Sequence, residues 1–410
     1  MKTINPTTIA LFFQAHQPFR IKEYDFFHIG KEPDYFDNAK NLEILNRVCD
    51  RSYVPAIALF EKLHQESKGQ FSFGLGISGT LLTQLEQSRP DVLEKFQSLV
   101  SRGIAHLVGG TYTHSLATLF STQEQGRQIQ QHKKILYRLF GRRPQVFANT
   151  ELIYRDDMVQ MIDSLGYKTI LAEGVSDYLG HRAPDYMYTP PSNEKINLLL
   201  RNEGLSDDVG FRFANTSWEQ YPLTAEKYLS WIQGSDAPVR NIFLDLETIG
   251  EHQGVETGIF AFWESFISQA ISAGHKVVSP EKAVETLQSV DVYSSPKHSS
   301  WADGEKDKSA WLANVMQQES SQKLFRMQQT INATNDAGLE QSWNRLQSAD
   351  HFMYMSTKAG SAGEVHQRFS PHGDPYDAYS YFMNVLADLQ IRSKMKMAQE
   401  TIKQTQHIVL

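Results

Sequence analysis

Acidic side chains follow two apolar runs of the chain, at the points where those runs end. Glu151 comes shortly after the run 145–148, and Asp245 closes the run 242–245. Because an isolated buried carboxylate is costly, Glu151 could serve as a helix N-cap or a salt-bridge partner. Two carboxylates that meet in one cleft can instead cleave a glycosidic bond, with one of them donating a proton.

The second run leads into a dense group of ionisable residues. Asp245, Glu247, Glu251 and His252 stand close together in the sequence. Asp245 and Glu247 are two residues apart, so their side chains share a face in extended backbone. Repulsion between neighbouring carboxylates raises the pKa of one of them, as a proton donor at neutral pH requires. The same groups could instead hold a divalent cation, and this alternative stays open.

Histidine and aromatic residues follow two further apolar runs. His16 comes after the run 9–14, and Tyr112 and His114 stand in the loop after Gly109. Each could contact a ligand, although a structural histidine and a packed loop are the more ordinary outcomes. Aromatic faces pack against sugar rings, and their polar edges bond hydroxyl groups. Further aromatic residues fall near the same run ends, with core packing as the alternative: Tyr154, Trp218, Tyr221 and Trp263.

Signatures of several other enzyme classes are absent from the sequence. It contains no Gly-x-x-x-x-Gly-Lys-Ser/Thr phosphate loop and no Gly-x-Ser-x-Gly turn. A carboxylate pair without these signatures indicates glycoside hydrolysis. Two alternatives stay open, a metal-dependent polysaccharide deacetylase and a non-catalytic carbohydrate-binding protein. The deacetylase would need a metal-ligating cluster, and no second histidine stands near His16 or His252 at metal-ligand spacing.

The elements that must position these residues alternate along the first 290 residues or so. Continuous apolar runs predict strands of a parallel sheet that is covered on both faces, and amphipathic stretches predict helices. About seven repeats of strand and helix indicate an α/β barrel, with an open doubly wound sheet as the alternative. The predicted strands are 9–14, 70–75, 105–109, 145–148, 169–172, 196–200, 242–245 and 276–278. The predicted helices are 54–65, 78–88, 90–101, 123–140, 158–165, 224–233, 258–273 and 280–289.

The composition changes near residue 290. The stretch 292–307 is rich in Ser, Pro, Lys and Asp and indicates a linker. We therefore predict a catalytic domain over 1–290 and a helical bundle over 291–410. The bundle's predicted helices are 309–333, 337–349 and 375–405, with a polar loop over 358–375 that contains His366 and His372.

Charge and cysteine content limit the class of protein. The net charge of −7 does not favour nucleic-acid binding, and the single cysteine, Cys49, fits a reducing compartment. No run approaches the roughly 20 apolar residues of a membrane span, and residues 1–10 do not read as a signal peptide. We expect a cytoplasmic protein that contacts neither nucleic acid nor membrane. The sequence predicts no oligomeric state.

Taken together, these residues resemble glycoside hydrolase family 57, in particular its α-amylase-type members. The resemblance covers nearly the whole chain, and it rests on the number and order of short motifs. These motifs are His16-Gln17-Pro18, the loop Gly109–Ser115, Asn149-Thr150-Glu151, Asp245–His252, Trp311–Asn314, Asp350-His351-Phe352, Phe369-Ser370-Pro371 and Met383–Asp388.

The resemblance implies an incomplete seven-stranded (β/α) parallel barrel followed by a C-terminal α-helical bundle that covers the cleft. It implies α-amylase-like, retaining hydrolysis of α-1,4-linked glucans such as maltooligosaccharides, without a metal or other cofactor. The family's nucleophile maps to Glu151 and its acid/base to Asp245. Helper positions in the substrate cleft map to His16, His114, Glu247, Glu251, His252 and Trp311, to which the aromatic argument adds Tyr112 and Trp218.

Two positions depart from the pattern of some members. Gln14 stands where they have a histidine, and His114 stands where they have a carboxylate. Both changes leave the acid pair intact. A 4-α-glucanotransferase would use the same pair, so the balance between hydrolysis and glycosyl transfer stays open.

Overall fold

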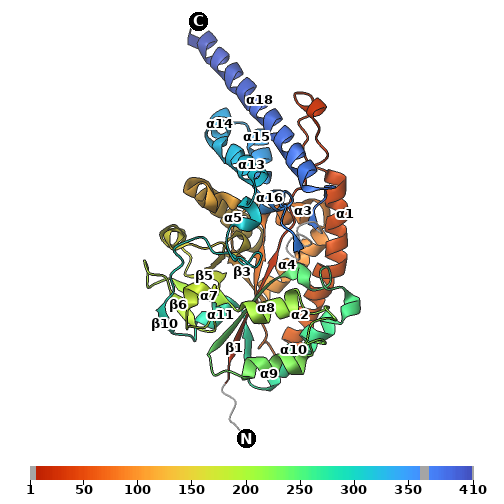
Figure 1. Ribbon diagram of the computed structural model, residues 1–410, viewed down its shortest axis with the longest axis vertical. Coiled ribbons are helices and arrows are strands. Elements are labelled where there is room, and N and C mark those ends of the chain that lie inside the picture. Colours follow the sequence, from red (N-terminus) through yellow and green to blue (C-terminus); the bar gives the residue numbers. More distant parts are fainter. Residues whose placement is uncertain (1–5, 361–368, 409–410) are drawn as a thin grey trace. The chain divides into compact units, whose positions relative to one another are not determined.

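The computed structural model describes residues 6–360 and 369–408 and divides the chain into two compact units (Figure 1). The first unit, called the barrel unit below, contains residues 1–17, 43–112 and 129–301. The second, called the helical unit, contains residues 18–42, 113–128 and 302–410. Among the described residues, no helix is both long and apolar enough to cross a membrane.

The barrel unit is built on one ten-stranded sheet in the described part of the chain. Most of its strands are buried at every residue or at every residue but one, as a sheet covered on both faces requires. The strands are β1 (Thr8–Ala15), β2 (Phe73–Ile77), β3 (Ala105–Gly109), β4 (Val146–Ala148), β5 (Thr169–Glu173), β6 (Met187–Thr189), β7 (Asn197–Arg201), β8 (Val239–Asp245), β9 (Lys276–Val278) and β10 (Ser289–Val292).

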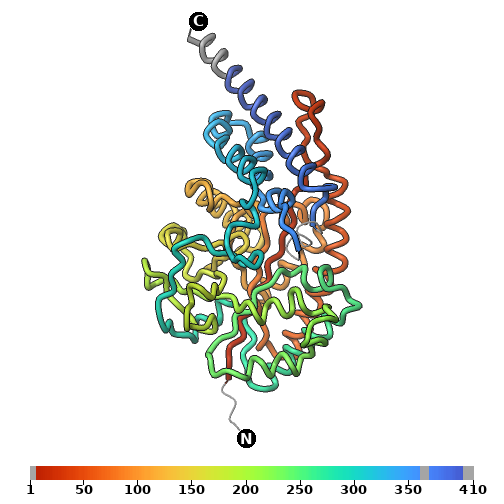
Figure 2. The backbone as a smooth tube through the Cα atoms, in the orientation of Figure 1, coloured from red at the N-terminus to blue at the C-terminus, as the bar shows by residue number. Residues whose placement is uncertain are grey.

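Seven strands form a continuous parallel run in the order β7-β5-β4-β3-β2-β1-β8. The two ends of this run meet. The Asn202 backbone N–H donates to the Asn241 carbonyl at 2.9 Å, and the Asn241 side chain donates to the Leu200 carbonyl at 2.9 Å. The sheet therefore curls into a seven-stranded ring, which confirms the predicted incomplete (β/α) barrel. Figure 2 traces how distant segments, such as red β1 and green β8, come together.

Three strands lie outside this ring. β9 pairs with the first half of β1, β6 runs antiparallel to β7, and β10 pairs with β6. β6 and β10 are not among the strands predicted from the sequence, and the predicted helix 280–289 overlaps the start of β10. That prediction was wrong at its end, because the helix stops at Val284 and Ser289 begins β10. β10 is exposed at every residue, so it lacks the apolar signal used to find the others.

Helices follow the ring strands, and most match the predicted ranges within one or two residues. Side-chain oxygens cap several of them: Ser78, Thr224 and Ser279 each accept a backbone N–H from the first turn of the helix that follows. The helices are α2 (Val54–Glu66), α3 (Gly79–Ser88), α4 (Pro90–Ser101), α6 (Val159–Ser164), α7 (Ser176–Leu179), α8 (Glu203–Gly210), α9 (Ala225–Gln233), α10 (Ile259–Ser272) and α11 (Pro280–Val284).

Aromatic side chains fill the core on one face of the sheet. Phe13 of β1 packs against Phe60, Phe73 and Trp263, with ring centroids 5.4 to 5.7 Å apart. Trp263 lies on α10, which packs beside α9 and α2 along one flank of this unit (Figure 1). Because these rings are fully buried, they fix β1 in place and with it the residues that follow this strand.

The helical unit contains no strand among its described residues. The predicted helix 309–333 is broken at two points. Asn314 forms a capping box with Gln317 that starts a new helix, and another break follows Arg326. Of the polar loop, His372 is described and His366 lies outside the described residues. The helices of this unit are α12 (Ser309–Leu312), α13 (Val315–Arg326), α14 (Gln328–Thr334), α15 (Ala337–Arg345), α16 (Ala349–Met353) and α18 (Pro375–Ile408). Two further helices, α1 (Asn38–Val48) and α5 (Thr122–Phe140), contribute residues to both units.

Candidate active site

Glu151 stands on a strained turn directly beyond β4. Glu151 and Leu152 both have positive φ, 53° and 51°, a region that non-glycine residues seldom occupy. The turn is closed by hydrogen bonds from Leu152 N to Asn149 O and from Ile153 N to Thr150 O, at 3.0 and 2.9 Å. Such strain persists only where the surroundings hold it, and it concentrates at functional sites.

A segment far downstream holds this turn from the other side. Ser300 Oγ and the Trp301 backbone N–H both donate to the Glu151 carbonyl, at 2.9 and 3.2 Å. The indole Nε1–H of Trp301 donates to Glu151 Oε2 at 2.7 Å. Backbone and carboxylate of Glu151 are therefore both fixed by the two residues Ser300 and Trp301.

Arg201, the last residue of β7, joins several strand ends. Its Nε donates to the Phe243 carbonyl of β8 at 3.0 Å, and its guanidinium donates to Glu173 Oε2 of β5 at 3.0 Å. The same guanidinium lies 5.6 Å from the centroid of the Trp301 ring. Glu151 is thus connected through Trp301 and Arg201 to the strand that ends in Asp245. Both acids lie at the carboxyl end of one ring of parallel strands.

Two carboxylates, Glu173 and Asp207, surround the Arg201 guanidinium. Burial alone would lower its pKa, but the neighbouring carboxylates Glu173 and Asp207 raise it overall. The arginine is 3% exposed and Glu173 is fully buried. A buried cation of this kind needs its carboxylate partners, since an unpaired buried charge is strongly destabilising. The cluster is a fixed electrostatic feature of the site.

Asp245 ends β8 and is half-buried. It pairs in register with Gln14 of the adjacent β1, one of the positions that depart from the family pattern. The Gln14 side chain fills the space above Gly76, where an added Cβ would lie 2.3 Å from Gln14 Oε1. The Gln14 side chain thus lies over β2, next to the strand position of Asp245.

Glu247, two residues farther on, is buried at 5% exposure. Its Oε1 accepts hydrogen bonds from the backbone N–H of His16, at 3.0 Å, and from the Tyr53 hydroxyl. Burial raises the pKa of Glu247 to about 7, against the lowering effect of the Tyr53, His16 and Gln17 hydrogen bonds. This side chain ties the ends of β1 and β8 to the residues that begin α2. The enclosed Glu247 carboxyl group therefore acts as a clamp that holds β1, β8 and the start of α2 together.

His16, Glu251 and His252 occupy different positions around this clamp. His16 is half-buried, and its Nδ1 shares a 2.7 Å hydrogen bond with Ser78 Oγ. Glu251 pairs with Arg47 at 2.9 Å, so its carboxylate is engaged by the protein. The backbone of His252 donates to Glu247 O at 2.8 Å and its side chain is half-buried. His16 and His252 therefore flank Glu247, whereas Glu251 faces Arg47.

The two aromatic candidates of the barrel unit make protein contacts. The Tyr112 hydroxyl shares a 2.8 Å hydrogen bond with Thr83, and its ring covers Gly79 so closely that an added Cβ would lie 2.2 Å from Tyr112 Cδ2. Trp218 packs edge-on against Trp231 with centroids 6.2 Å apart. Of the other aromatic residues that the sequence singled out, Tyr154 and Trp263 are fully buried in the core, and Tyr221 is exposed.

The remaining two candidates belong to the helical unit. His114 is 7% exposed and has a positive φ of 55°, and its carbonyl accepts the Ala349 N–H at 2.9 Å. Trp311, on α12, is 1% exposed. Both are therefore enclosed by protein in this unit.

Sequence reasoning missed three residues of the site: Trp301, Arg201 and Glu173. Trp301 stands in the Ser- and Pro-rich stretch that was interpreted as a linker. Arg201 and Glu173 each come one residue after a predicted strand, where the same rule that found Glu151 and Asp245 would have found them. An arginine at a strand end is a signal in its own right, because a buried arginine requires carboxylate partners.

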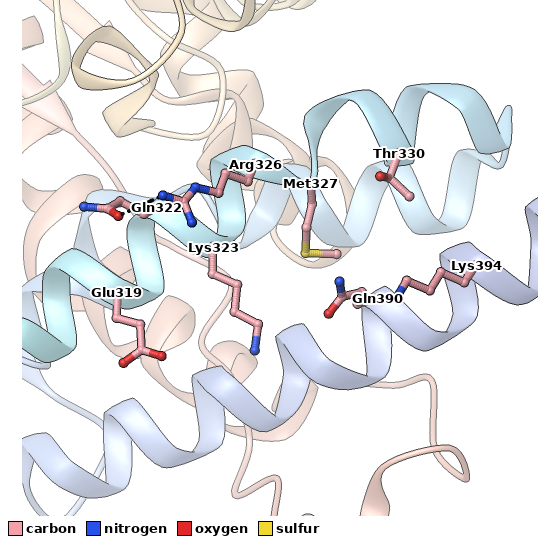
Figure 3. A pocket seen from close by; sticks show the side chains of 8 residues that line it. All are labelled: Glu319, Gln322, Lys323, Arg326, Met327, Thr330, Gln390 and Lys394. Atoms are coloured by element: carbon pink, nitrogen blue, oxygen red, sulfur yellow. Dashed lines mark hydrogen bonds between the residues drawn. The ribbon is translucent and has the colours of Figure 1, made fainter.

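The structure also contains a pocket of about 300 Å³ that lies entirely in the helical unit (Figure 3). It opens between α18 and the pair α13 and α14. Its single carboxylate and its several cations cannot supply an acid pair, so we do not assign catalysis to it. It is lined by Glu319, Gln322, Lys323, Arg326, Met327, Thr330, Gln390 and Lys394. Within the described ranges 6–360 and 369–408, no group of three or more His, Cys, Asp or Glu side chains is placed to hold a metal ion.

Several known proteins resemble this chain. One is the "Putative alpha-amylase" of Methanocaldococcus jannaschii, 36% identical over 403 residues that make up 95% of this chain and 85% of that protein. Among solved structures, a branching enzyme from Thermococcus kodakaraensis superposes with a TM-score of 0.66 at 12% identity, covering 95% of this chain and 94% of its own. A 4-alpha-glucanotransferase from Thermococcus litoralis superposes with a TM-score of 0.62 at 15% identity and 85% coverage of this chain, which spans only 56% of that protein.

The two solved structures, being so distant in sequence, show a shared fold. The M. jannaschii relative and a sequence profile show the family. The profile of "Glycosyl hydrolase family 57" matches residues 10–296. This range includes both acids, and Trp301 lies five residues beyond its end. The chain therefore belongs to glycosyl hydrolase family 57 and is a glycoside hydrolase.

Proposed function

We propose that the protein hydrolyses α-1,4 bonds of glucans and maltooligosaccharides in the manner of an α-amylase, with retention of configuration. Glu151 is the nucleophile and Asp245 is the general acid/base. One observation carries the proposal: Asp245 ends β8, Glu151 stands on the turn directly beyond β4 of the same parallel ring, and Trp301 and Arg201 connect these two strand ends. The strained backbone at Glu151 adds support, because such strain concentrates at functional sites.

The reaction follows from these two positions. Asp245 protonates the glycosidic oxygen while an oxygen of Glu151 bonds to the anomeric carbon, and the leaving sugar departs with the electron pair of the broken bond. Water then attacks the anomeric carbon and gives its proton to Asp245, and the bond to Glu151 breaks. Two inversions at one carbon produce net retention.

The structure supports a substrate contact more strongly for some of the predicted helper residues than for others. His16 and His252 flank Glu247 and are half-buried, so they are the best placed to bond sugar hydroxyls. Glu247 is better explained as the clamp that positions the ends of β1 and β8 than as a substrate ligand. Tyr112, His114, Trp218, Glu251 and Trp311 remain proposed substrate contacts, as does the covering of the cleft by the helical domain predicted over 291–410.

Glycosyl transfer to a second glucan is the alternative function. It uses the same acid pair, with a sugar hydroxyl in place of water in the second step. Solved structures with this fold include a 4-alpha-glucanotransferase and a branching enzyme, and we therefore retain glycosyl transfer as the alternative. Products formed from a single maltooligosaccharide separate the two functions, because only transfer yields chains longer than the substrate.

The stereochemistry of azide rescue tests the assignment of both acids. In Asp245→Asn the glycosyl–enzyme forms from an activated substrate and azide resolves it, so the product is an α-glycosyl azide. In Glu151→Ala azide attacks the substrate directly and yields the β-glycosyl azide. The same anomer from both variants, or full activity of Glu151→Gln on a panel of α-linked oligosaccharides, would refute the assignment.

A cytoplasmic location is part of the proposal. Cys49 is buried, and burial raises the pKa of its thiol to about 12, so it is neither reactive nor available for a disulfide. A protein without disulfides suits a reducing compartment. Fractionation of the native organism's cells, followed by immunoblotting, tests this location.

A further inference from the structure

The indole of Trp301 makes a specific contact with the carboxylate of Glu151. Its Nε1–H donates to Oε2 at 2.7 Å, within the range of a charge-assisted hydrogen bond. The contact is not incidental, since the Trp301 backbone N–H and Ser300 Oγ both bind the Glu151 carbonyl. The paired backbones of Tyr154 and Ser299, with N–H to O distances of 2.9 and 3.0 Å, hold the two segments side by side.

We propose that Trp301 is a positioning residue that directs Glu151 Oε1 to the substrate and assists the second half of the reaction, the release of the carboxylate. The inference rests on the proposed role of Glu151 as the nucleophile. Because Oε2 is held by the indole, Oε1 is the oxygen that bonds to the anomeric carbon. Oε2 then becomes the carbonyl oxygen of the glycosyl ester.

The strength of this hydrogen bond changes during the reaction. When the ester forms, negative charge leaves the carboxylate and the indole faces a weaker acceptor. When the ester breaks, the electron pair of the C1–Oε1 bond returns to Glu151 and the charge on Oε2 is restored. The incoming water or sugar hydroxyl bonds to C1 and passes its proton to Asp245. A donor aimed at the developing charge stabilises this second transition state.

Arg201 strengthens the donor. Its guanidinium lies 5.6 Å from the centroid of the Trp301 ring, and a cation over an indole face draws electron density from the ring. The indole N–H becomes a better donor as a result, through the mutual polarisation that operates in buried networks. Arg201 is itself held in place by Glu173 at 3.0 Å and by the Phe243 carbonyl at 3.0 Å.

The two half-reactions can be measured separately in Trp301→Phe with an aryl α-maltooligoside. The release of the phenol in the first turnover reports formation of the ester, and the steady-state rate reports its breakdown. We expect the breakdown step to slow by roughly tenfold to a hundredfold, the range for a lost hydrogen bond to a charged group. Formation slows less, so the variant shows a burst of phenol and intact mass spectrometry detects the glycosyl–enzyme.

Trp343→Phe is a closely matched control. The Trp343 indole also donates a hydrogen bond, to the Leu324 carbonyl at 2.9 Å, and also lies beneath an arginine, with Arg127 5.7 Å from its ring centroid. It belongs to the helical unit, where it is fully buried. Trp343→Phe removes a hydrogen-bonded indole, as Trp301→Phe does, so it controls for the structural effect of that loss. We expect the ratio of burst rate to steady-state rate to be unchanged in this variant.

Other outcomes overturn the inference. Equal slowing of both steps in Trp301→Phe, or an unchanged steady-state rate, would show that the indole does not assist carboxylate release. If Trp301→Phe does not fold, benzothienylalanine at position 301 keeps the ring shape and replaces the N–H with sulfur, so the same comparison applies. If Glu151→Gln is inactive while the Trp301 variants behave like the wild type, only this inference fails. If Glu151→Gln retains activity, the proposed function fails.

Discussion

The buried carboxyl group of Glu247 makes the stability of the protein depend on pH in a way that Glu247→Gln would remove. In the folded protein burial raises the pKa of Glu247 from 4.5 to about 7. The native state therefore binds a proton between these two values that the unfolded chain releases. This contribution to stability is fully present below pH 4.5 and is lost as the pH rises through 7. The change corresponds to roughly 3 kcal/mol.

Glutamine keeps the shape of Glu247 and is neutral at every pH. It can still accept the hydrogen bonds from the His16 backbone, at 3.0 Å, and from the Tyr53 hydroxyl. The variant should therefore gain stability relative to the wild type as the pH rises, by about 3 kcal/mol between pH 4.5 and pH 8. Other titrating groups, such as buried His132 with its pKa lowered to about 4, affect both proteins equally and cancel in the difference.

Chemical denaturation at several pH values measures this difference. Glu94→Gln, at an exposed position of α4, controls for the removal of a carboxylate at the surface and should give a flat difference. If the free energy of unfolding of Glu247→Gln follows that of the wild type at a constant offset, Glu247 titrates like an ordinary carboxylate and the reasoning from its burial is refuted.

Three further predictions concern packing and charge, and each is measured by chemical denaturation. Arg201→Met leaves fully buried Glu173 and partly buried Asp207 without their cation and should cost about 3–5 kcal/mol, whereas Arg138→Met, which breaks an exposed ion pair with Glu86, should cost less than about 1 kcal/mol; equal costs would contradict the assignment of a buried cluster. Gly79→Ala should cost about 1–3 kcal/mol because its Cβ would overlap the Tyr112 ring, and a stabilised variant would show that the ring moves freely. Asp388→Leu should cost about 3–5 kcal/mol in the helical unit, since this fully buried carboxylate pairs with an arginine; little change would show that the pair is dispensable.

Much of the barrel was predictable because its strands have a strong local signal. Runs such as Ala105–Gly109 and Thr169–Glu173 are found within one residue of the predicted ranges, since strands buried on both faces are mostly apolar. β10 has no such signal: Ser289–Val292 is exposed, and its pairing with β6 depends on contacts made only after folding. The helix predicted over 309–333 failed for a different reason, because the capping box at Asn314 competes successfully with the apolar periodicity.

The acid pair was predictable from the same rule that found the strands. Glu151 and Asp245 stand where apolar runs end, and the ends of parallel strands meet at one rim. Trp301 was not predictable in this way, because its role depends on a contact across 150 positions of the sequence. The stretch around it is polar and resembles a linker in composition. The local sequence contains no trace of the turn with which it pairs.

Contacts from the segment 299–301 support the strained turn that carries Glu151. The turn that carries Glu151 has two consecutive residues at positive φ, and each such residue costs roughly 1–2 kcal/mol. Ser300 and Trp301 supply hydrogen bonds to Glu151 that offset this cost. The geometry of the turn that carries Glu151 therefore depends on a segment that follows every strand of the ring in the sequence. An incomplete barrel would retain both acids in its sequence and still lack a formed site.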